Sequence, residues 1–429
     1  MVAAGVRERT GVAGGRPAVG GCAAEMGYYN GGAQQTSGEE VEEIEEVKEM
    51  SGMEYRQYGT EGPLVSRLGF GVMRLPPRRK GQWGTVHFAK SLAIMRQAME
   101  AGVNFFDSHH GYHGGLSEVA IGRALKGWKG QRIYVQTKTP FYNEEPIDKF
   151  KKLLEEAVEK LGVDCIDYLL FHAMNMGTFK ARGKQFLKFT DWAMKRRLIR
   201  HRGFSSHDAP KNIKRFVDTG EFAAMLVSYN WQNPGVAEAI AYAADKGMGV
   251  SVMNPLAGGL LSAETRQIRR LLPGAKSSAE IALRYVLGTP GVALALSGMN
   301  TAEQVAENVA TAGRKTPLTA TQRKVMTGRL AEIRKKSLKL CTACGYCMPC
   351  ASGVDIPRNF TILNEARLLG LVDHSRRQFE RLGKDKNGDK SALACVKCGK
   401  CMPKCPNDVP IIAQLEEAAS LLGKAAGTR

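Results

Sequence analysis

Eight of the ten cysteines stand in two short runs near the C-terminus. The runs are Cys341, Cys344, Cys347 and Cys350, then Cys395, Cys398, Cys401 and Cys405. Three cysteines in series at such short spacing suit a [4Fe-4S] cluster, because three thiolates must bind three irons of one small cubane. Zinc sites usually use separated cysteine pairs, so two Zn(Cys)₄ sites are the less favoured alternative. Thiolate ligands require a reducing compartment, and we therefore expect a cytoplasmic location.

The second run ends in Cys405-Pro406 and resembles the C-x₂-C-x₂-C-x₃-C-P run of bacterial ferredoxins. In ferredoxins with two clusters, the fourth cysteine of each run binds the cluster held by the other run. The resemblance implies that Cys350 completes the second cluster and that Cys405 completes the first. The first run departs from the pattern, because Cys350 comes one residue early and Ala351 replaces proline.

A second set of reactive side chains follows three consecutive apolar runs in the first half of the chain. These are Asp107, Tyr112, Lys138 and His172. A tyrosine with a pKa near 10 is a weak acid at neutral pH unless a neighbouring cation stabilises its phenolate. A buried lysine held by an aspartate provides that cation, and a histidine can orient a carbonyl oxygen. The set is suited to protonating an oxyanion as a hydride reaches the carbon.

Short apolar runs alternate with amphipathic helical segments from about residue 67 to residue 312. The pattern predicts eight strands, at Leu68–Met73, Asn104–Asp107, Ile133–Thr137, Tyr168–Phe171, Arg202–Ser205, Met225–Val227, Gly249–Met253 and Val292–Leu296. Eight βα units in roughly 250 residues predict an α/β fold of the closed (β/α)₈ TIM-barrel type. An open doubly wound sheet is the alternative, but its Gly-rich turn after the first strand is missing.

The barrel segment resembles the aldo-keto reductase family over roughly residues 53–312. The matching stretches are Gly69–Pro76, Asn104–Tyr112, Thr137–Pro140, Tyr168–His172, Gly203–Ser206, Asn254–Gly259 and Ser297–Asn308. The resemblance implies a nicotinamide-dependent enzyme with Tyr112 as general acid. Lys138 and Asp107 tune that tyrosine, and His172 orients the substrate carbonyl. The neighbouring His109, His110 and His113 lack zinc-site spacing, and we interpret them as loop residues that line the pocket.

The same resemblance implies positions that hold NAD(P)H. They are Ser205 and Ser206 for the nicotinamide amide, Asn254, Pro255, Leu256 and Gly258 for the pyrophosphate, and Gly298, Gln304 and Asn308 for the adenosine end. The glutamine that commonly contacts the amide aligns with Leu226. Family members that prefer a 2′-phosphate place cations near positions 298 and 304, where this chain has Gly and Gln. The sequence therefore leaves the choice between NADH and NADPH open.

Composition divides the chain into three regions. Residues 1–52 hold four Lys or Arg and nine Asp or Glu, a net charge of −5, and we interpret them as a disordered acidic tail. Residues 53–328 form the predicted barrel, and residues 329–429 form a helical linker and a small α-helical ferredoxin-like domain with two [4Fe-4S] clusters. The other 377 residues carry a net charge of +24, which together with the −5 of the tail gives the total of +19. Such a positive charge suits anionic ligands, but no nucleic-acid motif is present. No apolar stretch approaches the ~20 residues of a membrane span.

Two functions fit this sequence. The favoured one is an oxidoreductase that reduces a small carbonyl substrate with NAD(P)H, or oxidises an alcohol in reverse. Its clusters then exchange electrons with an external carrier, act in regulation, or stabilise the fold of the C-terminal domain. The alternative is an iron–sulfur electron-transfer or redox-sensing protein whose barrel is a binding scaffold. Leu226, Gly298 and Gln304 motivate the alternative, because each removes an expected cofactor contact.

Overall fold

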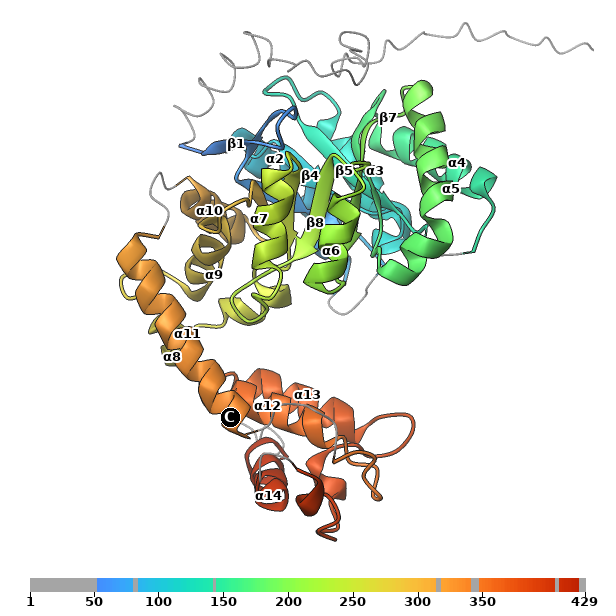
Figure 1. Ribbon diagram of the computed structural model, residues 1–429. Helices are drawn as coiled ribbons and strands as arrows, with labels where there is room; N and C mark the ends of the chain where they lie inside the picture. The colour runs from blue at the N-terminus through green and yellow to red at the C-terminus, as the bar shows by residue number, and fades with distance from the viewer. Residues whose placement is uncertain are drawn as a thin grey trace, which may run out of the picture.

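The computed structural model describes residues 52–79, 84–141, 144–313, 318–340, 347–405 and 409–423, without the side chains of 333–340. The predicted tail, apart from residue 52, lies outside the described residues. Within these ranges eight parallel strands close into a barrel in the order β10-β3-β4-β5-β6-β7-β8-β9, as predicted (Figure 1). The strands are β3 (Leu68–Gly71), β4 (Phe105–Asp107), β5 (Tyr134–Thr139), β6 (Ile166–Phe171), β7 (Ile199–Ser206), β8 (Ala224–Ser228), β9 (Gly249–Met253) and β10 (Leu294–Ser297).

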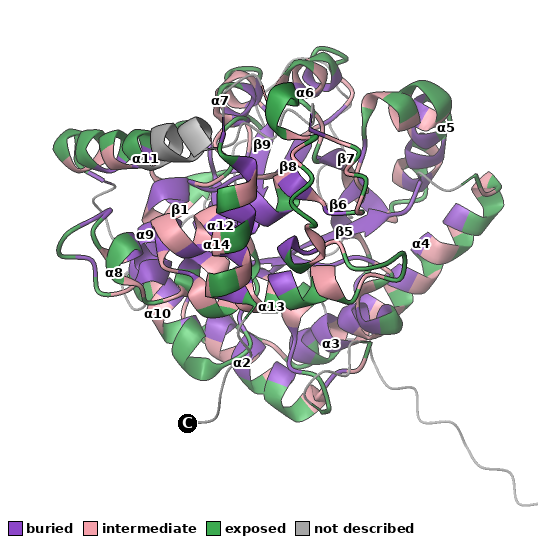
Figure 2. Cartoon of the chain, turned by 90° about the horizontal axis from the view of Figure 1, so that it is seen from below, coloured by how far each residue is buried: buried purple, intermediate pink, exposed green. Residues whose placement is uncertain are grey.

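Amphipathic helices surround the barrel with their exposed faces outward (Figure 2). They are α2 (Phe88–Glu100), α3 (Leu116–Leu125), α4 (Ile147–Leu161), α5 (Met176–Lys195), α6 (Pro210–Val217), α7 (Ala237–Asp245), α8 (Arg266–Arg269), α9 (Ser278–Leu287) and α10 (Ala302–Ala312). Helix α4 shows why the sequence forms them, since Phe150, Leu154, Ala157 and Leu161 share one buried face. Helix α9 begins at a serine cap, where Ser277 accepts a hydrogen bond from the Glu280 N–H.

An antiparallel hairpin of β1 (Tyr55–Gln57) and β2 (Leu64–Ser66) precedes the barrel and was not predicted. It lies at the end of the barrel where the strands begin, and the buried Tyr58 that follows β1 packs on Phe105 and Tyr168 inside the barrel. The strands therefore finish at the opposite end. In TIM barrels that second end carries the active site.

Helix α11 (Ala320–Leu340) leads from the barrel to a small C-terminal domain. That domain contains α12 (Ile356–Leu369), α13 (Val372–Gly383) and α14 (Ile411–Leu422), which pack around their own apolar core. The predicted helical linker, which begins at residue 329, is thus the second half of a longer helix. Within the described residues, no helix is long and apolar enough to cross a membrane.

The C-terminal domain docks on the loop that follows β9. Thr265 Oγ donates a hydrogen bond to the Leu369 carbonyl at 2.7 Å, and Leu369 and Leu371 belong to the barrel's apolar core. Gly370 lies against Gln267, because a Cβ at Gly370 would meet that side chain at 2.6 Å. In Figure 1 the domain lies below the barrel, and in Figure 2, seen from below, its helices lie in front of it. The domain therefore faces the barrel end at which the strands finish.

Candidate active site and cysteine cavity

The four predicted catalytic residues come together at the end of three neighbouring strands. Asp107 ends β4, Lys138 lies in β5, and His172 directly follows β6. Tyr112 opens the short 3-10 helix Tyr112–Gly115, in the loop between β4 and α3. Because β4, β5 and β6 are paired in this order, three side chains from distant parts of the sequence meet in one place.

A buried ion pair lies at the centre of this group. Lys138 Nζ lies 2.6 and 2.7 Å from the two carboxylate oxygens of Asp107 and 2.6 Å from the Ser108 carbonyl oxygen. The two side chains are only 1% and 8% exposed. Gln136 Nε2 donates a further hydrogen bond to Asp107 at 2.8 Å. Each partner is thus fully engaged, as a buried charge requires.

Lys138 also forms a hydrogen bond with Tyr112, and its Nζ lies 5.3 Å from the centre of the tyrosine ring. Burial acts to lower the pKa of Lys138, but the charges of Asp107 and Tyr112 and the hydrogen bonds to both outweigh it, so this pKa is raised. The ammonium therefore stays charged beside the phenol. A fixed cation at this position stabilises a phenolate and makes the tyrosine a better proton donor.

His172 is held neutral beside this pair. Burial, followed by repulsion from Lys138 and two other histidines, lowers the pKa of His172 to about 4. A neutral imidazole at neutral pH carries one N–H that can donate to a substrate oxygen. Because the His172 ring is uncharged, it does not compete with Tyr112 as the proton donor.

The sequence analysis assigned His109 only to the pocket wall, but the structure packs this residue directly against the predicted catalytic group. Its ring centre lies 4.2 Å from that of His172 and 5.1 Å from that of Tyr112. Burial lowers the pKa of His109 to about 2, helped by His172. Its Nδ1 accepts a hydrogen bond from the Gly111 N–H at 3.1 Å, so its proton is on Nε2, 3.0 Å from His110 Nδ1. Two adjacent histidines in the sequence do not by themselves predict these ring contacts and hydrogen bonds.

The third loop histidine, His113, is 8% exposed and adopts a left-handed backbone conformation with φ 53°. Neither ring nitrogen has a hydrogen-bond partner within the described parts of the chain. The surroundings of His113 thus differ from those of His109 and His110, whose side chains contact each other.

The predicted nucleotide positions lie on the other half of the same barrel end. Ser205 and Ser206 end β7, Asn254–Gly258 follows β9, and Gly298 follows β10. The pyrophosphate and adenosine positions are neighbours because β9 pairs with β10. Asn254 and Gly258 adopt left-handed backbone conformations with φ 56° and 70°, which form a tight turn after the strand.

Hydrogen bonds distinguish these predicted positions. Ser205 Oγ accepts from the Ala173 N–H at 2.8 Å, which leaves its own proton free to donate. Ser206 Oγ donates to the Met174 carbonyl and accepts from the Asp208 N–H, so its hydroxyl is occupied inside the protein. Gln304 and Asn308 bind Asn300 and Ser297, respectively. Ser205 is therefore the better candidate for an amide contact.

Leu226 is fully buried among apolar side chains inside the barrel. It can make no hydrogen bond to an amide.

The sequence analysis missed Arg74, which follows β3 and lies between the two nucleotide loops. A Cβ at Gly258 would come within 2.8 Å of Arg74 Nη2, and one at Gly298 within 3.2 Å of Arg74 Cβ. Both glycines thus make room for this side chain. Within the described residues Arg74 has no hydrogen-bond or ion-pair partner. The barrel closes by pairing β10 with β3, which places this cation beside Gly298.

Five cysteines line one cavity of about 310 Å³ in the C-terminal domain: Cys347, Cys350, Cys395, Cys398 and Cys401. Burial raises the pKa of Cys401, and the nearby Cys395, Cys350 and Cys398 raise it further. Cys350 therefore lies close to the second cysteine run despite its early position. Within the described residues, no three His, Cys, Asp or Glu side chains converge on a single-ion site.

The remaining predicted ligands divide into two groups. Cys405 Sγ accepts a hydrogen bond from the Val409 N–H at 3.4 Å, an interaction that stabilises a thiolate. Cys341 and Cys344 lie outside the described residues.

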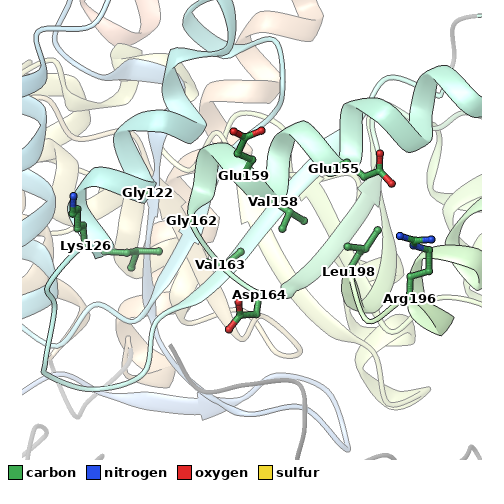
Figure 3. A pocket seen from close by; sticks show the side chains of 11 residues that line it. Gly122, Lys126, Glu155, Val158, Glu159, Gly162, Val163, Asp164, Arg196 and Leu198 are labelled. Atoms are coloured by element: carbon green, nitrogen blue, oxygen red, sulfur yellow. The ribbon is translucent and has the colours of Figure 1, made fainter. Parts of the chain in front are cut away.

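A larger cavity of about 600 Å³ lies away from both sites, between α3 and α4 (Figure 3). Its lining includes Val163 and Leu198, which precede β6 and β7. It therefore opens at the end of the barrel where the strands begin, opposite the tetrad.

Comparisons with known proteins agree with this architecture. Residues 67–327 match the model of the aldo/keto reductase family, and residues 340–410 match a 4Fe-4S dicluster domain. The chain belongs to the aldo/keto reductase family. It is thus an oxidoreductase with a C-terminal 4Fe-4S dicluster domain, as the sequence predicted.

The similarity to known proteins extends over the barrel. L-galactose dehydrogenase from Arabidopsis thaliana is 27% identical over 284 residues, which span 60% of this chain and 87% of that protein. NADH-specific methylglyoxal reductase from Escherichia coli (strain K12) is 24% identical over 301 residues, 59% of this chain and 91% of that protein. An aldo-keto reductase structure from Bacillus halodurans, in its holo form, has a TM-score of 0.56 and 27% identity over 65% of this chain and 96% of its own.

The pKa of His172 predicts how stability responds to acid. Because this pKa is about 4 when folded and about 6.5 when unfolded, the unfolded chain binds the proton first as the pH falls. The free energy of unfolding therefore decreases as the pH falls from about 6.5 towards 4. We expect His172→Gln to lose roughly 1–2 kcal/mol less stability than the wild type between pH 7 and pH 5. Urea denaturation at both pH values checks this, and equal losses would contradict it.

Proposed function

We propose that the barrel reduces the carbonyl group of a small aldehyde or ketone with NAD(P)H, or oxidises the corresponding alcohol. The observation that carries the proposal is the buried contact of Lys138 with both Asp107 and Tyr112, beside a neutral His172. A bound nicotinamide supplies a hydride to the carbonyl carbon. The protein's task is to hold the carbonyl oxygen and to give it a proton.

Each residue of the tetrad has one step in this proposal. Tyr112 donates its phenolic proton to the oxygen as negative charge develops there. Lys138 stabilises the phenolate that remains, and Asp107 fixes the position of Lys138 through two short contacts. His172 donates an N–H to the same oxygen and so orients the carbonyl. In the reverse direction the Tyr112 phenolate takes the proton from the alcohol.

The residues around Arg74 support nucleotide binding. A guanidinium between two glycine-containing turns suits a pyrophosphate, because it can donate paired hydrogen bonds to phosphate oxygens. Ser205 supplies a donor for the nicotinamide amide, and the turn from Asn254 to Gly258 offers backbone N–H groups. Gly298 and Gln304 offer no second cation for a 2′-phosphate. We therefore propose that NADH is used at least as well as NADPH. The relative from Escherichia coli is an NADH-specific methylglyoxal reductase.

We further propose two [4Fe-4S] clusters in the C-terminal domain. Cys395, Cys398, Cys401 and Cys350 would hold one of them, and the support is that Cys395, Cys350 and Cys398 all lie close enough to Cys401 to raise the pKa of its thiol. Cys341, Cys344, Cys347 and Cys405 would hold the other. The proposed boundaries are 53–328 for the barrel and 329–429 for linker and cluster domain. Free thiolates need a reducing environment, which supports a cytoplasmic location.

Tyr112→Phe tests the proton donor. The variant keeps the ring but removes the acid, so we expect aldehyde-dependent oxidation of NADH or NADPH to fall by at least about 10²-fold. Nucleotide affinity stays within about twofold, since the hydroxyl donates to the substrate. Tyr242→Phe, which changes an exposed tyrosine hydroxyl bound to Asp218, serves as the matched control. Turnover that survives in Tyr112→Phe would refute the assignment.

Arg74→Gln tests the nucleotide site. We expect the dissociation constants of NADH and NADPH to rise about tenfold, because one charge-assisted contact to phosphate is lost. Fluorescence quenching measures this without turnover, and Arg78→Gln, an exposed arginine four residues away, is the control. Equal affinities in wild type and Arg74→Gln would remove Arg74 from the site. Failure of the wild type to bind either nucleotide would favour the alternative function, in which the barrel is only a scaffold.

Cys350→Ser tests the ligand set of the second cluster. With one thiolate gone, we expect iron and sulfide in anaerobically purified protein to fall from about eight of each per chain towards about four. Ser352→Ala is the control, because Ser352 lines the same cavity without providing a sulfur. Unchanged iron content in Cys350→Ser would show that the second run binds its metal without the first.

A further inference from the structure

Exposed apolar side chains lie within and next to the second cysteine run in the sequence. Among the described residues, the five large apolar side chains that lie exposed include Leu393 at 60%, Val396 at 69% and Met402 at 39%. These three fall within ten residues of one another in the sequence, and Val396 also lines the cysteine cavity. Single exposed apolar residues are ordinary, but a group of them marks an interaction surface.

The cavity behind this surface is open to the outside. Cys398 is exposed, whereas Cys347 on the other run is buried. Electron transfer slows steeply with distance, so a cluster bound by Cys398 is best reached from this face. The apolar surface therefore lies where an electron-transfer partner would have to approach.

The charged residues within this segment of the sequence are all lysines. The segment from Leu393 to Cys405 contains Lys397, Lys400 and Lys404 and no Asp or Glu. All three lysines are exposed. Lys397 Nζ lies 2.5 Å from Glu416, while neither Lys400 nor Lys404 has an ion-pair partner in the parts of the chain that the structure describes. Protein interfaces typically combine apolar side chains with charged ones, and the two lysines without an ion-pair partner fit an acidic partner.

We propose that Leu393, Val396 and Met402, together with Lys397, Lys400 and Lys404, dock a small acidic protein that carries single electrons on a flavin or an iron–sulfur cluster. The proposal rests on the cluster ligands proposed above. In the docked pair one electron leaves the reduced carrier and enters the oxidised cluster behind Cys398, and no bond forms or breaks. Lys400 and Lys404 steer the carrier, and the apolar centre holds it.

The test uses the full-length chain with its clusters, purified anaerobically. Reduced flavodoxin, an acidic flavin protein, is mixed with the oxidised chain, and bleaching of the cluster absorbance gives the second-order rate constant. We expect the double variant Lys400→Glu/Lys404→Glu to react at least about tenfold more slowly than the wild type, whose rate falls with added salt. Val396→Glu, which puts a charge into the apolar centre, is also slowed.

The control is Lys386→Glu, an exposed lysine elsewhere in the same domain, which stays within about twofold of the wild type. Cytochrome c, a basic one-electron protein, is the second probe. We expect the double variant with reduced clusters to pass electrons to it faster than the wild type does. Iron content and the electron paramagnetic resonance spectrum after excess dithionite must match the wild type, which separates a docking defect from a damaged cluster.

Equal flavodoxin rates in the wild type, the double variant and Val396→Glu would overturn the proposal, as would a rate that salt does not change. Self-association of the wild-type chain that Val396→Glu abolishes would assign the surface to a second copy and also overturn it. A chain that binds no iron would overturn both this proposal and the cluster ligands. Loss of aldehyde reduction alone would affect only the barrel's proposed activity.

Discussion

The contact between Lys138 and Asp107 is the interaction on which the catalytic end of the barrel depends. A buried ammonium is costly unless it is surrounded by acceptors, and here the carboxylate, the Ser108 carbonyl and Tyr112 surround it. The pairing of β4 with β5 fixes the distance, so the fold holds the charge in place before any substrate arrives. Removing either partner would leave an uncompensated charge inside the protein, which makes the site part of the stability of the barrel.

The loop after β9 joins the two functional parts of the molecule. It begins with the turn from Asn254 to Gly258, beside Arg74, and continues to Thr265, whose hydroxyl binds the C-terminal domain at Leu369. One short segment thus contacts both the candidate nucleotide site and the domain that carries the cysteines. Leu369 and Leu371 extend the barrel core into this junction, so the two domains do not pack as independent units.

The sequence was most informative where one residue type has one physical role. All eight barrel strands were predicted near their observed positions, because their apolar runs are bounded by helical periodicity. The hairpin Tyr55–Gln57 with Leu64–Ser66 was missed, since its first strand is short and largely exposed. Asp107, Lys138 and His172 could be found because they follow strands that must be neighbours in a parallel barrel.

Other parts of the site depend on packing that no sequence pattern specifies. The contact of His109 with His172 follows from the path of one loop, and the place of Arg74 follows from the closing of β10 on β3. The leucine at position 226, where the family commonly has a glutamine, is visible in the sequence, but the occupied hydroxyl of Ser206 shows only in three dimensions. The nearness of Cys350 to the second run was implied by the resemblance to ferredoxins, since spacing alone leaves the crossover undetermined.

The exposure of Cys398 has a consequence for handling the protein in air. Dioxygen reaches an iron–sulfur cluster most readily where a ligand thiolate is open to solvent, as Cys398 is, and much less readily behind a buried residue such as Cys347. The cluster proposed at Cys398 should therefore lose its iron first in air. The barrel shares no ligand with either run, so its fold should survive the loss of both.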